Sequence, residues 1–97
     1  AGELDTYDVR RTVTEGLAPY VGANMASASV NGHLDKLGVT STLIAADEVE
    51  TLLSWLGPGL SVFVGPARGA QVIDEIREKL GIAEVESERA IAHRLGA

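Results

Sequence analysis

The segment Gly65-Pro66-Ala67-Arg68-Gly69 comes closest to a binding motif in residue type and spacing. Pro66 suits the first position of a helix, and the first N–H groups of a helix can bind an anion because they have no carbonyl partner. Arg68 would add a positive charge there. The segment lacks both the Gly-Lys-Ser/Thr of a P-loop and the G-x-G-x-x-G of a dinucleotide site. Two alternatives therefore stay open for Gly65, Arg68 and Gly69: an anion-binding helix start, or a Gly/Pro hinge between closely packed helices.

The titratable residues give little support for acid–base or metal chemistry. Asp47 and Glu50 fall in an expected first helical turn, where the helix dipole favours negative charge. An acid–base site would need Asp35, Asp47 or Glu50 beside His33, and nothing in the sequence predicts that arrangement. His33 and His93 are isolated in a chain without cysteine, so no metal-ligand set is recognisable, and we expect His33 to be a partly buried helix residue. The sequence therefore predicts no catalytic residue, no metal site, no cofactor and no enzyme.

The few aromatic residues, together with the single methionine, are the candidates for an interface. Trp55 falls near the end of an expected helix, where it is either a core residue or an interface anchor. Tyr20 and Phe63 occupy equivalent positions of an internal repeat, which favours a pair of core residues. We predict Tyr20, Met25, Trp55 and Phe63 as interface residues, with core packing as the alternative for Tyr20 and Phe63.

An internal repeat defines the elements that position these residues. Residues 6–38 resemble residues 49–81, and Gly38 aligns with Gly81. A repeat of this length is usually one supersecondary unit, which buries its apolar face only against another unit. We predict a single domain over residues 1–97, built from two similar helix–hinge–helix halves.

Apolar periodicity predicts helices over Thr6–Gly16, Ala23–Leu37, Ala46–Leu56, Pro66–Leu80 and Glu86–Leu95. Gly38 and Gly81 are expected to end the second and fourth of these. Leu60–Val64 is ambiguous: its composition favours a short strand, whereas Pro19 in the equivalent segment favours a helical turn or hinge. The predicted fold class is all-α, a compact domain of four to five helices. The alternative is a small α+β domain with a short strand at 60–64.

Composition indicates either a compact aliphatic core or surplus apolar surface. Hydrophobic residues make up 45% of the chain and aromatic residues only 4%. A small chain with much apolar surface often covers part of it with a partner or a second copy.

Charge and length exclude other classes. The net charge of −6 argues against binding to nucleic acids and to anionic membranes, since both attract lysine and arginine. No apolar run is long enough to span a membrane. The absence of cysteine fits a cytoplasmic location. A start at Ala1-Gly2 rather than Met is typical of a domain excised from a larger protein.

The run from Leu17 to Gly22, Leu-Ala-Pro-Tyr-Val-Gly, resembles a hinge of bacterial signalling proteins. Followed by a helix of small and apolar residues and by Asp47–Leu53, it is similar to the small helical C-terminal modules of bacterial serine/threonine kinases and forkhead-associated proteins. Ala23 stands where that family has Pro, and the helix lacks the family's basic residues. The resemblance covers roughly residues 10–56 and implies a non-catalytic accessory role, with no functional residue carried over.

Taken together, these features predict a non-enzymatic protein-interaction or oligomerisation module. We expect it to be cytoplasmic, to be part of a larger bacterial protein or complex, and to bind a protein partner or itself. The alternative is a small-ligand or anion-binding regulatory domain that uses the helix start at Gly65–Gly69.

Overall fold

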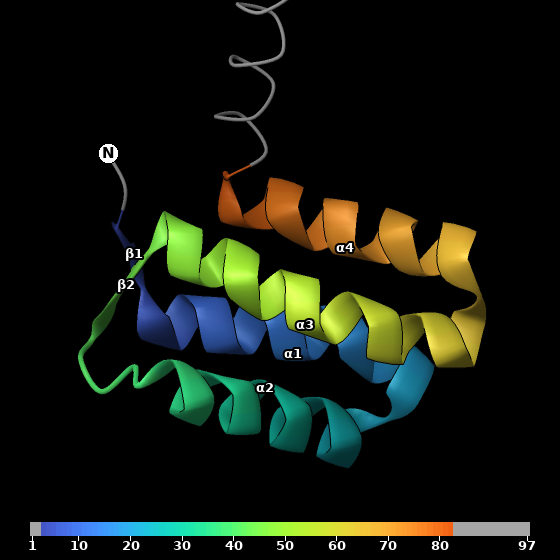
Figure 1. Ribbon diagram of the computed structural model, residues 1–97, viewed down its shortest axis with the longest axis horizontal. Coiled ribbons are helices and arrows are strands. Elements are labelled where there is room, and N and C mark those ends of the chain that lie inside the picture. Colours follow the sequence, from blue (N-terminus) through green and yellow to red (C-terminus); the bar gives the residue numbers. More distant parts are fainter. Residues whose placement is uncertain (1–2, 83–97) are drawn as a thin grey trace, which may run out of the picture.

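The computed structural model describes residues 3–82, which form four helices and one two-stranded sheet (Figure 1). In chain order the elements are β1 (Glu3–Asp5), α1 (Thr6–Val21), α2 (Ala23–Leu37), β2 (Leu43–Ala45), α3 (Ala46–Val64) and α4 (Pro66–Leu80). The helices α1 and α3 pack against each other, and α2 and α4 lie on either side of this central pair (Figure 1). The fold is therefore all-α, as predicted, with a minimal sheet at one end.

The short sheet joins the starts of the two central helices. β1 pairs antiparallel with β2, with Leu4 opposite Ile44, and the N–H of Thr6 donates to the carbonyl of Thr42 at 2.9 Å. Ile44 is buried in the core. Neither strand is predicted from the sequence, because three residues carry too little alternation to be recognised.

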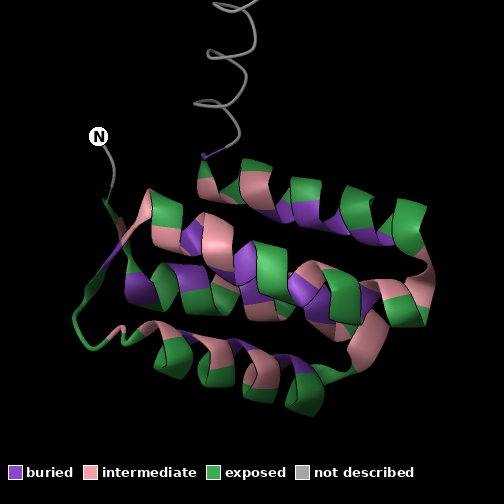
Figure 2. Cartoon of the chain, in the orientation of Figure 1, coloured by how far each residue is buried: buried purple, intermediate pink, exposed green. Residues whose placement is uncertain are grey.

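Aliphatic side chains from all four helices form one core. The stripe of α1 that faces it is Val9, Val13 and Leu17, the spacing of four that an amphipathic helix requires. In Figure 2 the buried surfaces of α2 and α4 are turned toward the two central helices. Among the described residues, no aromatic side chain belongs to the fully buried set.

Both central helices are longer than predicted, because they continue through a proline. Pro19 lies inside α1 and Pro58 inside α3, and both rings are exposed. A proline in a helix interior removes one hydrogen bond and costs about 3 kcal/mol. Beyond Pro19, Tyr20 and Val21 still pack against the core, and beyond Pro58, Leu60 is buried, so this packing offsets that cost. The predicted helix ends at residues 16 and 56 and the alternative strand at 60–64 are thus wrong.

Single glycines link the helices within each half. Gly22 has φ 90° and ψ 150°, and Gly65 has φ 89° and ψ 157°, a region that side-chain-bearing residues rarely adopt. Gly38 and Gly81 end α2 and α4 in the left-handed conformation, as predicted. The order strand–helix–Gly–helix–Gly is therefore the same in β1–α2 and in β2–α4. Helices α2 and α4 begin and end at the predicted residues, and the predicted helix at 86–95 lies outside the described residues.

Candidate protein-interaction site

A groove of about 110 Å³ runs between α2 and α3. Its floor is made by the buried side chains of Leu17, Leu56 and Leu60. Its rim carries large apolar side chains that face solvent: Met25 is 48% exposed, Trp55 40% and Phe63 54%. The groove is thus an apolar cleft with an apolar rim. We call it the α2–α3 groove.

Helical spacing of four places the rim residues in two facing rows. Trp55, Gly59 and Phe63 follow one another along α3, and Met25, Ser29 and His33 do the same along α2. Residues four apart lie on one face of a helix, so each row is continuous. Val62, next to Phe63 on α3, is 84% exposed but does not line the groove.

His33 and Trp55 connect the two rows. Their ring centroids are 5.5 Å apart and the rings are inclined at 50°. His33 is half-buried on α2, as predicted. Its Nδ1 atom is buried, and within the described part of the chain it has no hydrogen-bond partner. The imidazole therefore forms part of the groove wall.

Apart from the histidine, the groove is lined by residues that carry no charge. α2 has no charged side chain from Ala23 to Leu34, and α3 has none from Thr51 to Val64. By contrast, a cavity between α3 and α4 includes Asp74 and Arg77 in its wall. An uncharged face of this length is notable in a chain of net charge −6.

Three of the four predicted interface residues meet in this groove. Met25, Trp55 and Phe63 line it, whereas Tyr20 is half-buried against the core and faces the Arg68 guanidinium, 5.8 Å from the ring centroid. Phe63 is exposed, so the alternative of a core pair between Tyr20 and Phe63 is wrong.

His33 and Gly59 line the groove but are not predicted as interface residues from the sequence. The signal was present, because each lies at a multiple of four residues from Met25 or Trp55 on its own helix. The spacing along α3 could be recognised only once this helix was known to continue through Pro58 to Val64.

The predicted anion-binding residues are engaged in packing. The N–H of Gly65 donates to Ser61 O at 2.8 Å, and the N–H of Gly69 donates to Gly65 O at 2.9 Å. Gly69 is buried, and a Cβ there would lie 2.6 Å from Ser61 Oγ. Arg68 lies over the Tyr20 ring in a cation–π contact. Close packing at Gly69 is what a hinge between helices requires, and anion binding at this helix start stays a prediction.

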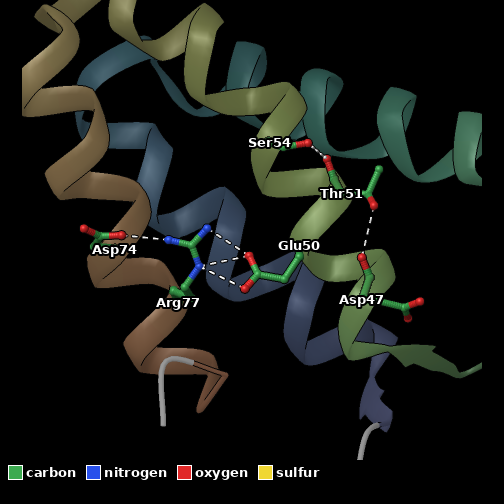
Figure 3. A network of polar contacts seen from close by, with 6 residues as sticks. All are labelled: Asp47, Glu50, Thr51, Ser54, Asp74 and Arg77. Carbon is green, nitrogen blue, oxygen red and sulfur yellow. Dashed lines mark hydrogen bonds and ion pairs between the residues drawn. The ribbon is translucent and has the colours of Figure 1, made fainter. Parts of the chain in front are cut away.

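Two of the three carboxylates of α3, Glu48 and Glu50, have structural partners, and Figure 3 shows those of Glu50. Arg77 of α4 donates from Nε and Nη2 to Glu50 Oε1, at 2.9 and 2.8 Å, and from Nη1 to Asp74 Oδ1 at 2.7 Å. Glu48 Oε1 accepts the N–H of Ala45 at 3.1 Å, which is half of a capping box, since Ala45 has no side-chain acceptor. Glu50 thus ties α3 to α4, and Glu48 stabilises the start of α3.

The hydroxyl groups near these carboxylates are bonded within α3. Thr51 Oγ1 donates to Asp47 O at 3.1 Å, and Ser54 Oγ donates to Thr51 O at 2.7 Å (Figure 3). Such bonds to the preceding turn are usual for hydroxyls on a helix. Over residues 3–82, no group of three or more His, Asp and Glu side chains is placed to hold a metal ion.

Comparison of the chain with protein-family models, with curated proteins and with solved structures gives no match. The resemblance to bacterial signalling modules therefore stays a prediction. Within the described residues, no helix combines the length and the hydropathy needed to cross a membrane.

Proposed function

We propose that this chain is a non-enzymatic protein-interaction module that self-associates through the α2–α3 groove. The observation that carries the proposal is the exposure of Met25, Trp55 and Phe63 around one apolar cleft. Large apolar side chains gathered on one face are typical of a surface that another molecule covers. Tryptophan and other aromatic residues are also frequent among residues that carry binding energy.

The absence of charge on this face favours a second copy as its occupant. Two chains of net charge −6 repel each other over most orientations. The α2–α3 groove is a face on which two copies can meet without bringing carboxylates together. Covering it also desolvates no charged group, which is a major cost at charged interfaces. A strongly basic partner would instead find its complementary charges elsewhere on the molecule.

The shape of the face also favours pairing with a second copy. It presents protruding side chains, Trp55 and Phe63, on either side of a shallow position, Gly59. In a two-fold dimer the same patch is used by both copies, so protrusions and hollows must occur on one surface. In this role the chain would act as an accessory part of a larger bacterial assembly in the cytoplasm, as the resemblance of its Leu17–Gly22 hinge implies.

The test is the molar mass over a series of protein concentrations, measured by light scattering after size exclusion. The 10.1 kDa chain should approach twice its mass as concentration rises. Phe63→Glu should stay monomeric, because a charge would then be desolvated in the groove. A matched control is Tyr7→Glu, since Tyr7 is an aromatic residue on α1 that is 66% exposed and does not line the groove.

Far-UV circular dichroism would establish that both variants keep the helical fold. A wild-type chain that stays monomeric at all concentrations would overturn the proposal. So would equal weakening of association by the two substitutions, because the groove would then have no special part in it.

A further inference from the structure

We infer that two copies pair through antiparallel α3 helices that cross at Gly59, with Trp55 of each copy against Phe63 of the other. The inference rests on the proposed self-association and adds the geometry of the interface. It draws on three features: an unexplained glycine, the internal repeat, and the distribution of acidic residues along α3.

Gly59 has no structural reason inside the described chain. Glycine in a helix interior costs about 1 kcal/mol relative to alanine, so its presence calls for a compensating contact. Gly16 and Gly69 have one, because a Cβ at either position would lie 2.6 Å from a side-chain atom of Ile76 or Ser61. A Cβ at Gly59 or at Gly32 would meet nothing within 4 Å, but of these two glycines Gly59 alone lines the groove. Close approach of a second backbone would supply the missing reason.

The equivalent glycine in the first half of the repeat shows which contact such a position can make. Gly59 corresponds to Gly16, which receives the side chain of Ile76 from α4. The residue of α2 that corresponds to Ile76 is His33, and it packs against Trp55 instead of covering Gly59. Gly16 of α1 is therefore covered by α4 within the chain, whereas the equivalent Gly59 of α3 is not covered by α2.

Spacing along α3 determines which side chains meet if Gly59 is the crossing point. Trp55 lies four residues before Gly59 and Phe63 four residues after it, on the same face. In an antiparallel pair centred on Gly59, Trp55 of one copy therefore lies opposite Phe63 of the other. The two-fold axis repeats this contact on the other side.

Charge selects the antiparallel over the parallel arrangement. The first turn of α3 carries Asp47 and Glu48, and its last turn carries no charge. Parallel helices would place the two acidic turns side by side, where like charges repel. Antiparallel helices that cross at Gly59 separate them by roughly 36 Å, because Asp47 of each copy lies about 18 Å from the crossing point at about 1.5 Å per residue. Antiparallel helix dipoles also attract each other.

Disulfide trapping tests this geometry directly, because the chain contains no cysteine. Trp55→Cys and Phe63→Cys are purified separately, mixed, and oxidised under mild conditions. In an antiparallel mixed dimer one Trp55–Phe63 contact becomes a disulfide and the other stays native. The mixture should therefore give roughly tenfold more disulfide-linked species than either variant alone, because pairing raises the effective concentration of the two thiols.

The control is Gln71→Cys, an exposed position on α4 outside the groove, mixed with Trp55→Cys. Mass spectrometry separates mixed from homodimeric products, since the two groove variants differ in mass. Efficient cross-linking of each groove variant alone would show parallel pairing and overturn the inference. No excess over the control, while the wild type dimerises in solution, would overturn the inference and leave the proposed function standing. A wild-type chain that stays monomeric would overturn both the inferred geometry and the proposed function.

Discussion

At the scale of single residues, two equivalent glycines have opposite surroundings. Gly16 lies against Ile76, and Gly59 has open space above it. We expect Gly16→Ala to lower the free energy of unfolding by about 1–3 kcal/mol, because Ile76 must move to accommodate the methyl group. Gly59→Ala should raise it by up to about 1 kcal/mol, because helix propensity improves at no steric cost.

Urea unfolding at low protein concentration, where association is minimal, measures both effects. If Gly59 lies at the interface, the same Gly59→Ala substitution should weaken dimerisation while it stabilises the monomer. A substitution that shifts both properties in the same direction would contradict this expectation.

A buried threonine offers a second test at this scale. Thr6, at the start of α1, is 6% exposed, and its Oγ1 has no hydrogen-bond partner among the described residues. A hydroxyl buried without a partner costs about 1–3 kcal/mol in proteins. Thr6→Val should therefore raise the free energy of unfolding by about 1 kcal/mol, measured by urea titration. Thr6→Ser, which keeps the hydroxyl and loses a methyl group, should lower it; a loss of stability in the valine variant would contradict the prediction.

At the scale of elements, the sequence predicted which helices exist better than where two of them end. The starts and ends of α2 and α4 could be predicted, because Pro66 favours a helix start and Gly38 and Gly81 favour helix ends. The ends of α1 and α3 were not, because Pro19 and Pro58 favour termination locally, while packing of Tyr20 and Val21 and burial of Leu60 favour continuation. Tertiary packing of this kind outweighs the intrinsic helix propensities of single residues.

The same limit applies to the candidate site. Met25, Trp55 and Phe63 stand out in the sequence as large apolar residues in a chain with few aromatics. Their convergence depends on the packing of α2 beside α3 and on the continuation of α3 past Pro58. No local pattern encodes either feature, so the residues were predictable and the groove was not.

The ion pair between Glu50 of α3 and Arg77 of α4 should have a coupling free energy that can be measured. The side chain of Arg77 is 20% exposed and that of Glu50 30%, so the pair is partly desolvated. We expect Arg77→Ala to lower the free energy of unfolding by about 1–3 kcal/mol, largely because Glu50 is left half-buried without its partner. A double-mutant cycle with Glu50→Ala should give a coupling of roughly 1 kcal/mol.

Asp74 supplies the matched control, since it contacts the same guanidinium but is 69% exposed. Its coupling to Arg77 should be under about 0.5 kcal/mol, as for other exposed pairs spaced three or four apart on a helix. Equal coupling for the two carboxylates would show that burial does not distinguish them.

At the scale of the whole molecule, net charge and the uncharged face make opposing contributions to association. Repulsion between two chains of charge −6 is screened by salt, whereas contact between apolar surfaces is not weakened by it. We therefore expect the dimer to become tighter as sodium chloride rises from low to moderate concentration. Sedimentation velocity at several salt concentrations measures this, and dissociation on addition of salt would indicate an interface held by ion pairs instead.

The pairing of β1 with β2 also has a consequence for the order of folding. Each helical hairpin brings together residues that are close in sequence, but the sheet joins residues 3–5 to residues 43–45 and so closes a long loop. Loop closure costs entropy before any distant contact forms, so local hairpins are expected to form early and the sheet late. In pulse-labelling hydrogen exchange during refolding, the amide of Thr6, which donates to Thr42, should gain protection after the amides of α2 and α4.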